Sequence, residues 1–123
     1  MDKSKNKIKG DLGENIATGY LVNRGYKIIE RNFRCNAGEI DIVCKKEETL
    51  VFVEVKAKTT EFFGAPEEMV DWRKMEKISE AIEFFITTHH YKEEPNYRID
   101  VIAIVLDEND KIKRFNHIEN FGG

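Results

Sequence analysis

The fold of this chain is decided by the stretch Gly38-Glu39-Ile40-Asp41-Ile42-Val43-Cys44-Lys45 and its continuation Leu50-Val51-Phe52-Val53-Glu54-Val55-Lys56-Ala57-Lys58. Both runs are rich in β-branched residues and alternate apolar with charged side chains toward their outer ends, which predicts two β-strands. The short segment Lys46-Glu47-Glu48-Thr49 joins them as an antiparallel hairpin. One face of this hairpin, which includes Ile40 and Ile42, is wholly apolar and is predicted to be core.

The other face of the predicted hairpin gathers the charged side chains. In the simplest register Asp41 lies directly opposite Glu54, and Glu39 lies opposite Lys56. Like charges opposed in this way destabilise a sheet, so we expect a divalent cation, Mg²⁺ or Mn²⁺, between Asp41 and Glu54. The carbonyl of Val55 is a candidate third ligand, because these cations prefer oxygen.

Lys56 is expected on the same face as these acids, where it would orient the attacking water or offset the charge that develops at phosphorus. The constellation therefore predicts hydrolysis of a phosphodiester. The alternative is a solvated ladder of ion pairs that joins Lys56 to Glu54 and to Glu39, which would contribute little to stability.

Composition restricts the class of protein further. The chain has 123 residues, of which 41% are hydrophobic and 35% charged, as expected for one globular domain. Its formal net charge of −3 argues against binding a polyanion over the whole surface. There is no apolar run of the roughly 20 residues that span a bilayer and no secretion signal, so we expect a cytoplasmic protein without a membrane partner. Cys44 is expected to be a buried thiol, not half of a disulfide.

Charge and turn residues suggest how the domain is bounded. Lysines alternate through the first residues, so residues 1–9 are predicted to be a flexible basic N-terminal arm, either solvated or in contact with phosphates. Residues 10–121 are predicted to form a single nuclease-like domain.

Hydrophobic periodicity predicts an α/β fold, in which a mixed β-sheet is flanked by helices in the order α-β-β-β-α-β-β. The first helix is expected from Leu12 to Arg24, with Asp11 as its cap and Glu14 completing a capping box. The second is expected from Pro66 to Thr88. Trp72, near its start, is expected to pack against the protein, with stacking on a base as the alternative. The strands are expected at 26–33, in the two halves of the hairpin, at 97–106 as a central strand, and at 111–118 as an edge strand.

Several separated motifs together resemble one known family. They are Gly13-Glu14, Arg31-Asn32-Phe33-Arg34, Gly38-Glu39-Ile40-Asp41, Phe52-Val53-Glu54-Val55-Lys56, Phe63-Gly64, Lys74 and Arg98-Ile99-Asp100. Over nearly the whole chain this set is similar to the YraN family of bacterial proteins. That family looks like a branch of the PD-(D/E)XK nuclease superfamily, near the archaeal Holliday-junction resolvases.

The resemblance implies a restriction-endonuclease-like core and assigns roles to residues. It implies that Asp41 is the metal-binding acid, Glu54 the second acid and Lys56 the catalytic lysine. It also implies that Glu14 is an extra helix-borne acid that adds to the metal site, although the capping box explains Glu14 equally well. Glu39 is expected to be auxiliary.

Four basic residues are candidate nucleic-acid contacts. Lys74 is expected to reach a phosphate or to snorkel from the core edge, and Arg98 is expected to bind substrate or to pair with Asp100. The full set of predicted contacts is Arg34, Lys58, Lys74 and Arg98.

These observations predict a Mg²⁺- or Mn²⁺-dependent endonuclease that hydrolyses DNA, and analogy with the resolvases suggests branched, Holliday-junction-like DNA. Two alternatives stay open: a non-catalytic nucleic-acid-binding protein with the nuclease fold, and an RNA-processing nuclease. A homodimer, formed through the second helix or an edge strand, would suit cutting of two strands.

Overall fold

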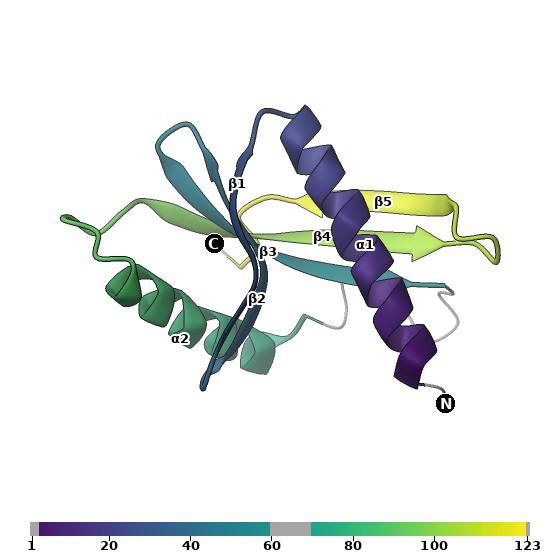
Figure 1. The fold of residues 1–123 in the computed structure, drawn as a ribbon, viewed down its shortest axis with the longest axis horizontal. Coiled ribbons are helices and arrows are strands. Elements are labelled where there is room, and N and C mark those ends of the chain that lie inside the picture. The colour runs from purple at the N-terminus through teal and green to yellow at the C-terminus, as the bar shows by residue number, and fades with distance from the viewer. Residues whose placement is uncertain (1–2, 60–69, 123) are drawn as a thin grey trace.

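The hydrophobic patterns correctly predicted the order of elements, α-β-β-β-α-β-β. A computed structural model describes residues 3–59 and 70–122, with side chains from Gly10 onward. Figure 1 shows a twisted sheet with the two helices set apart from each other around it. The elements are α1 (Lys3–Asn23), β1 (Lys27–Cys35), β2 (Gly38–Lys46), β3 (Thr49–Lys58), α2 (Trp72–Thr88), β4 (Tyr97–Leu106) and β5 (Ile112–Ile118).

The five strands form one mixed sheet in the order β1-β2-β3-β4-β5. Neighbouring strands are antiparallel except β3 and β4, which are parallel. A parallel pair needs a crossover, and the chain between β3 and β4 contains α2. Residues Val101 to Leu106 of β4 are all buried, which confirms the prediction of a central strand covered on both faces.

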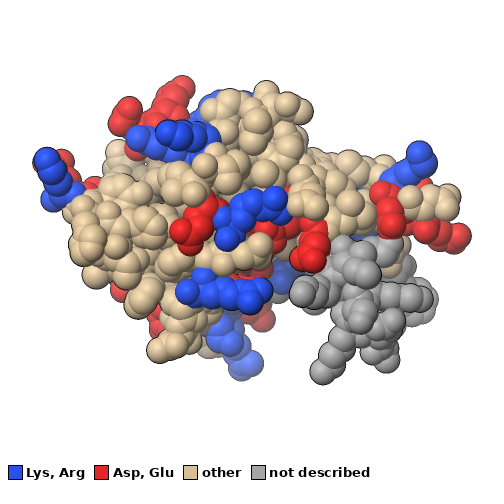
Figure 2. All heavy atoms as spheres, in the orientation of Figure 1, with Lys and Arg blue, Asp and Glu red and all other residues tan. Residues whose placement is uncertain are grey.

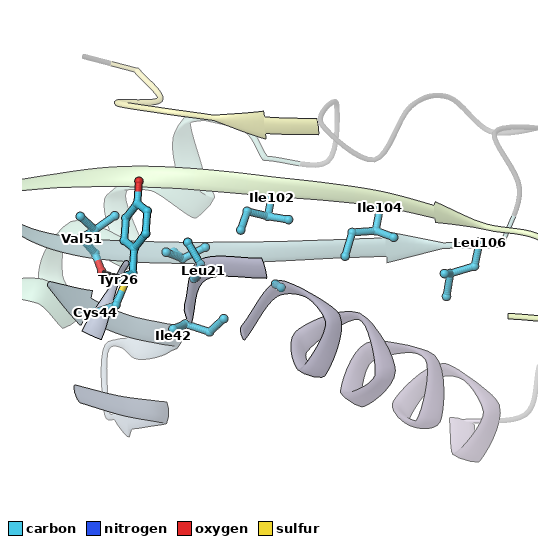
Figure 3. Packing of buried hydrophobic residues seen from close by; sticks show 10 residues of the cluster. Leu21, Tyr26, Ile42, Cys44, Val51, Ile102, Ile104 and Leu106 are labelled. Carbon is cyan, nitrogen blue, oxygen red and sulfur yellow. Dashed lines mark hydrogen bonds between the residues drawn. The ribbon is translucent and has the colours of Figure 1, made fainter. Parts of the chain in front are cut away.

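Two apolar cores lie on opposite faces of this sheet. On one face, Ala17 and Leu21 of α1 pack against the sheet, and Figure 3 shows Leu21 among Ile42, Val51 and Ile102. On the other face, residues of α2 cover a second cluster that contains Val43 and Phe52. The face of the hairpin predicted to be charged therefore has two parts. Near the turn, Val43 and Phe52 belong to the core under α2, and only the end away from the turn is charged.

Both helices begin at residues that differ from the prediction. α1 begins at Lys3, not Leu12, so Asp11 lies inside the helix and does not cap it. α2 begins at Trp72, with Asp71 as N-cap accepting from the backbone N–H groups of Arg73 and Lys74. Of the start predicted at Pro66, positions 66–69 lie outside the described residues.

A close approach between α1 and β3 explains one glycine in the helix. A Cβ on Gly13 would lie 2.5 Å from the Cβ of Ala57, which is too close for any other residue at this position without a shift of the helix. Gly13 therefore lets α1 approach the outer end of β3, and it brings the adjacent Glu14 against the sheet.

The surface carries charges of both signs. Figure 2 shows positive and negative side chains interspersed on the face turned to the viewer, with no single continuous basic patch. In the described part of the chain, neither helix is long and apolar enough to cross a membrane.

Candidate active site

The pairing between β2 and β3 ends at Ile42, directly next to the predicted site residue Asp41. The pairs from Lys46 with Thr49 to Ile42 with Val53 follow the predicted register. Beyond them, Oδ2 of Asp41 accepts a hydrogen bond of 2.7 Å from the backbone N–H of Val55. A side chain thus replaces the main-chain pairing between the strands at this point.

This break corrects two details of the prediction. Glu39 lies opposite Arg34 of β1, with 3.2 Å between Oε2 and Nε, and not opposite Lys56. Ile40 packs in the cluster under α2, whereas Ile42 packs in the cluster under α1. Side-chain alternation is therefore interrupted around Asp41, because β2 leaves β3 there and continues with β1 alone.

Glu54 is buried on β3, with 3% of its surface exposed, and it is paired with two lysines. Its Oε1 lies 3.3 Å from Nζ of Lys56 and 3.4 Å from Nζ of Lys74. Lys56 follows two residues later on the same face of the strand, and Lys74 reaches down from the first turn of α2. A buried carboxylate is costly unless it is paired, so the two lysines offset the cost of burying Glu54.

Glu14 is buried on α1, and its Oε1 accepts two hydrogen bonds of 3.0 Å, from Nε of Arg31 and from Nδ2 of Asn32. Because α1 begins at Lys3, the capping-box explanation for Glu14 is wrong. Arg31 and Asn32 belong to β1, where Asn32 has a φ of 55°. Their role as donors to Glu14 was not foreseen, although they were among the motif residues.

A cavity of about 290 Å³ joins several of the predicted site residues. It lies between α1, the end of β2 and β3, and it admits solvent beside Asp41. Glu54 and Lys56 are not among its lining residues. It is lined by Gly10, Asp11, Glu14, Asn32, Arg34, Glu39, Asp41 and Val55.

The carboxyl of Asp41 is the most perturbed acid at this site. Burial raises its pKa from 3.8 to about 7, and the neighbouring charge of Glu54 adds to the rise. The N–H of Val55 acts in the opposite direction, while Glu14 and Glu39 raise the pKa of Asp41 further. Perturbed acids of this kind gather at functional sites.

The donor set fits a hard divalent cation. Asp41 and Glu54 would supply carboxylate oxygens, and a cation between them would relieve the repulsion that raises the pKa of Asp41. Within residues 3–59 and 70–122, no group of three or more His, Cys, Asp or Glu side chains is placed to hold a metal ion. Mg²⁺ commonly uses only one or two protein carboxylates and completes its shell with water and substrate phosphate, so two acids suffice.

The remaining predicted contacts are not all brought together. Lys58 ends β3 on the same face as Glu54 and Lys56. Arg34 is exposed at the cavity rim and paired with Glu39.

Arg98 lies on the opposite face of the sheet from Glu54. The even-numbered residues of β4 face α1, whereas Glu54 faces α2. It donates to Asp100, at 3.0 Å from Nε, and to the hydroxyl of Tyr26. The structure therefore favours the ion-pair alternative for Arg98.

These observations define an α/β protein with a mixed sheet between two helices, in the element order expected of a restriction-endonuclease-like core. The chain belongs to the uncharacterised protein family UPF0102, whose model matches residues 13–104. This confirms the resemblance to the YraN family.

Bacterial relatives cover most of the chain. A UPF0102 protein of Caldicellulosiruptor bescii is 40% identical over 111 residues, which are 90% of this chain and 93% of the relative. One of Caldanaerobacter subterraneus subsp. tengcongensis is 41% identical, with 98% of each chain covered. One of Clostridioides difficile is 44% identical, with 94% of this chain and 96% of the relative covered.

Proposed function

We propose that this chain is a metal-dependent nuclease that hydrolyses phosphodiester bonds of nucleic acid, with DNA as the favoured substrate. One observation carries the proposal: the carboxyl of Asp41 lies at an open cavity, with its pKa raised to about 7 by burial and by the charge of Glu54. A fold gains no stability from such an arrangement, which suggests that it serves a ligand.

Asp41 and Glu54 are the residues that would hold Mg²⁺ or Mn²⁺, with Glu14 and the carbonyl of Val55 as further candidates. When bound, such an ion supplies Lewis acidity toward a phosphoryl oxygen and lowers the pKa of a coordinated water.

The ammonium groups of Lys56, on β3, and Lys74, on α2, both lie next to Oε1 of Glu54. Negative charge that develops on the phosphoryl oxygens during hydrolysis would be stabilised by these ammonium groups. Lys56 is the better candidate to orient the attacking water, because it shares a strand face with Glu54. Lys74 is the better candidate to hold the substrate phosphate, because it approaches from α2.

Cleavage assays test this proposal. Purified protein is incubated with linear, flapped and four-way-branched DNA, and with RNA of the same sequences, with Mg²⁺, Mn²⁺ or EDTA. We expect cleavage that needs the metal, that falls at least about hundredfold in Asp41→Asn, and that falls about a hundredfold to a thousandfold in Lys56→Met.

Two charge-matched variants control this assay. Glu80→Gln and Lys92→Met remove exposed charges elsewhere and should cleave like the wild type. Cleavage that survives EDTA, or that Asp41→Asn retains in full, would overturn the proposal.

One observation favours a second candidate, a non-catalytic nucleic-acid-binding protein. Glu54 is already neutralised by Lys56 and Lys74, an arrangement that also suits a structural ion pair. That candidate predicts salt-dependent binding of nucleic acid without metal-dependent turnover in the same assay.

A further inference from the structure

Trp72 is the single tryptophan of the chain, and it is exposed where packing was predicted. It begins α2, and 67% of its surface is accessible. Large aromatic side chains usually bury most of their surface. Its exposure therefore needs a reason that the two cores do not supply.

The position of Trp72 ties it to the candidate active site. It lies in the first turn of α2 with Lys74, whose Nζ is 3.4 Å from Oε1 of Glu54. Two residues of an α-helix advance only about 3 Å along its axis. The indole thus lies at the same end of α2 as Lys74, although the two side chains leave the helix about 200° apart and only Lys74 is directed at Glu54.

One cation lies against this ring. The guanidinium of Arg73 lies 5.4 Å from the centroid of the Trp72 indole, and the next residue, Lys74, directs its ammonium to Glu54. Proteins that hold single-stranded nucleic acid combine aromatic faces, on which bases stack, with cations that follow the phosphates. An exposed aromatic ring with one cation against it, at the helix end whose Lys74 contacts Glu54, has the composition of such a platform.

We infer that Trp72 stacks on an unpaired nucleobase of the substrate, while Arg73 and Lys74 contact the adjoining phosphates. This inference rests on the proposed function for the kind of ligand, and it narrows the substrate class. A base inside a duplex is already stacked on both faces, so the platform selects nucleic acid with an unpaired base next to the scissile phosphate: a single strand, a flap or a branch point.

Because Trp72 is the sole tryptophan, its fluorescence reports stacking directly and without turnover. The protein is titrated in EDTA with a short oligothymidylate and with an abasic strand of the same length, which keeps the phosphates and lacks the bases. We expect quenching by the oligothymidylate and little or none by the abasic strand. A matching RNA oligomer, oligouridylate, shows whether the sugar matters.

Two substitutions at this position separate stacking from folding. Trp72→Ala should lose about tenfold in affinity for the oligothymidylate while its affinity for the abasic strand is unchanged. Trp72→Phe keeps an aromatic face and should retain most of the affinity. The control is Val22→Ala, which shortens another exposed apolar side chain, on α1, and should bind like the wild type.

The outcomes distinguish this inference from the proposed function. Base-dependent quenching without metal-dependent cleavage would support the platform and overturn the nuclease. Cleavage with equal quenching by both strands, or with unchanged affinity in Trp72→Ala, would overturn the platform and leave the nuclease standing. Fluorescence that depends on protein concentration and not on bases would assign Trp72 to self-association, which also overturns the platform.

In an active preparation, Trp72→Ala should raise KM for a flapped substrate about tenfold with little change in kcat. KM for a blunt duplex should stay as in the wild type.

Discussion

Oδ2 of Asp41 accepts a hydrogen bond of 2.7 Å from the backbone N–H of Val55, at the point where the main-chain pairing of β2 with β3 ends, on the N-terminal side of Ile42. This contact holds the acid beside Glu54 while the two strands separate. The cavity lined by Glu14, Glu39 and Asp41 lies at this separation. The candidate site thus lies where the side chain of Asp41 replaces a main-chain hydrogen bond between the two strands.

The first prediction concerns the dependence of stability on pH. In the folded chain the pKa of Asp41 is raised to about 7 from 3.8. Between these values the native state holds a proton that the unfolded state has lost, so the contribution of Asp41 to stability falls as the pH rises and levels off above pH 7. Asp41→Asn removes this penalty and keeps an oxygen to accept from Val55. Urea denaturation should find it more stable than the wild type by about 2 kcal/mol at pH 8, a gap that closes toward pH 4.

Glu80→Gln provides the comparison, because it neutralises an exposed acid on α2. Its stability should follow the wild type within about 0.5 kcal/mol at every pH. An Asp41→Asn protein that is no more stable than the wild type at pH 8 would show that the carboxyl is not held against Glu54.

The second prediction concerns metal and stability. A cation that binds only the folded protein raises the free energy of unfolding by about 2.7 kcal/mol at a hundred times its Kd. Mn²⁺ should therefore raise the Tm of the wild type at pH 8, and less at pH 5.5, where Asp41 is largely protonated. Asp41→Asn should show no such rise. Equal shifts in both proteins would place the ion elsewhere.

Local pattern and turn chemistry predicted much of this structure. Alternation fixed the register of β2 with β3 over five pairs, because a one-residue slip would expose a whole face. The break at Asp41 was not predictable, since it depends on a side chain competing with a backbone carbonyl. The motif of Asp11 and Glu14 has the form of a capping box, but α1 starts at Lys3 and Glu14 is turned toward Arg31 and Asn32.

Contacts between distant segments were the hardest to foresee. The pairing of Lys74 with Glu54 requires α2 to be rotated about its axis so that Lys74 faces β3. The spacing of apolar residues along the sequence does not determine this rotation closely enough. The N-cap Asp71 has a local signal, an Asp directly before a periodic run, but Pro66 is an equally good signal for a helix start. Trp72, expected to pack near the start of a helix that begins at Pro66, is instead the first residue of α2 and is exposed.

The third prediction separates the two roles of Asn32, which bonds to Glu14 and has a φ of 55°. Asn32→Gly and Asn32→Ala both remove the bond to Glu14 and should both lower the cleavage rate about tenfold. Only alanine is strained in the left-handed region, so Asn32→Ala should be less stable than Asn32→Gly by about 1 kcal/mol. Full activity in both variants would mean that the position of Glu14 does not depend on Asn32.

The fourth prediction concerns the fully buried Asp100, on the face opposite Glu54. Its Oδ2 lies 2.8 Å from Nε2 of His117, and its Oδ1 accepts from Arg98 and from the backbone of Asn120. The ring of His117 is also 2.9 Å from the hydroxyl of Tyr20 on α1. One carboxylate therefore links β4, β5, α1 and the turn after β5.

Burial alone would raise the pKa of Asp100, but hydrogen bonds from His117 and Arg98 hold it below its ordinary value. A depressed pKa contributes stability that is present above the ordinary value and is lost as the pH falls through the folded one. Asp100→Asn removes the buried charged partner of Arg98 and leaves it only the exposed Glu119, at 3.8 Å, and it should cost about 3 kcal/mol at pH 7 in urea denaturation. This loss should shrink below pH 4, where the wild type loses the same charge. The exposed Glu108→Gln should cost less than about 0.5 kcal/mol, and a comparable loss in both variants would mean that the network does not stabilise the fold.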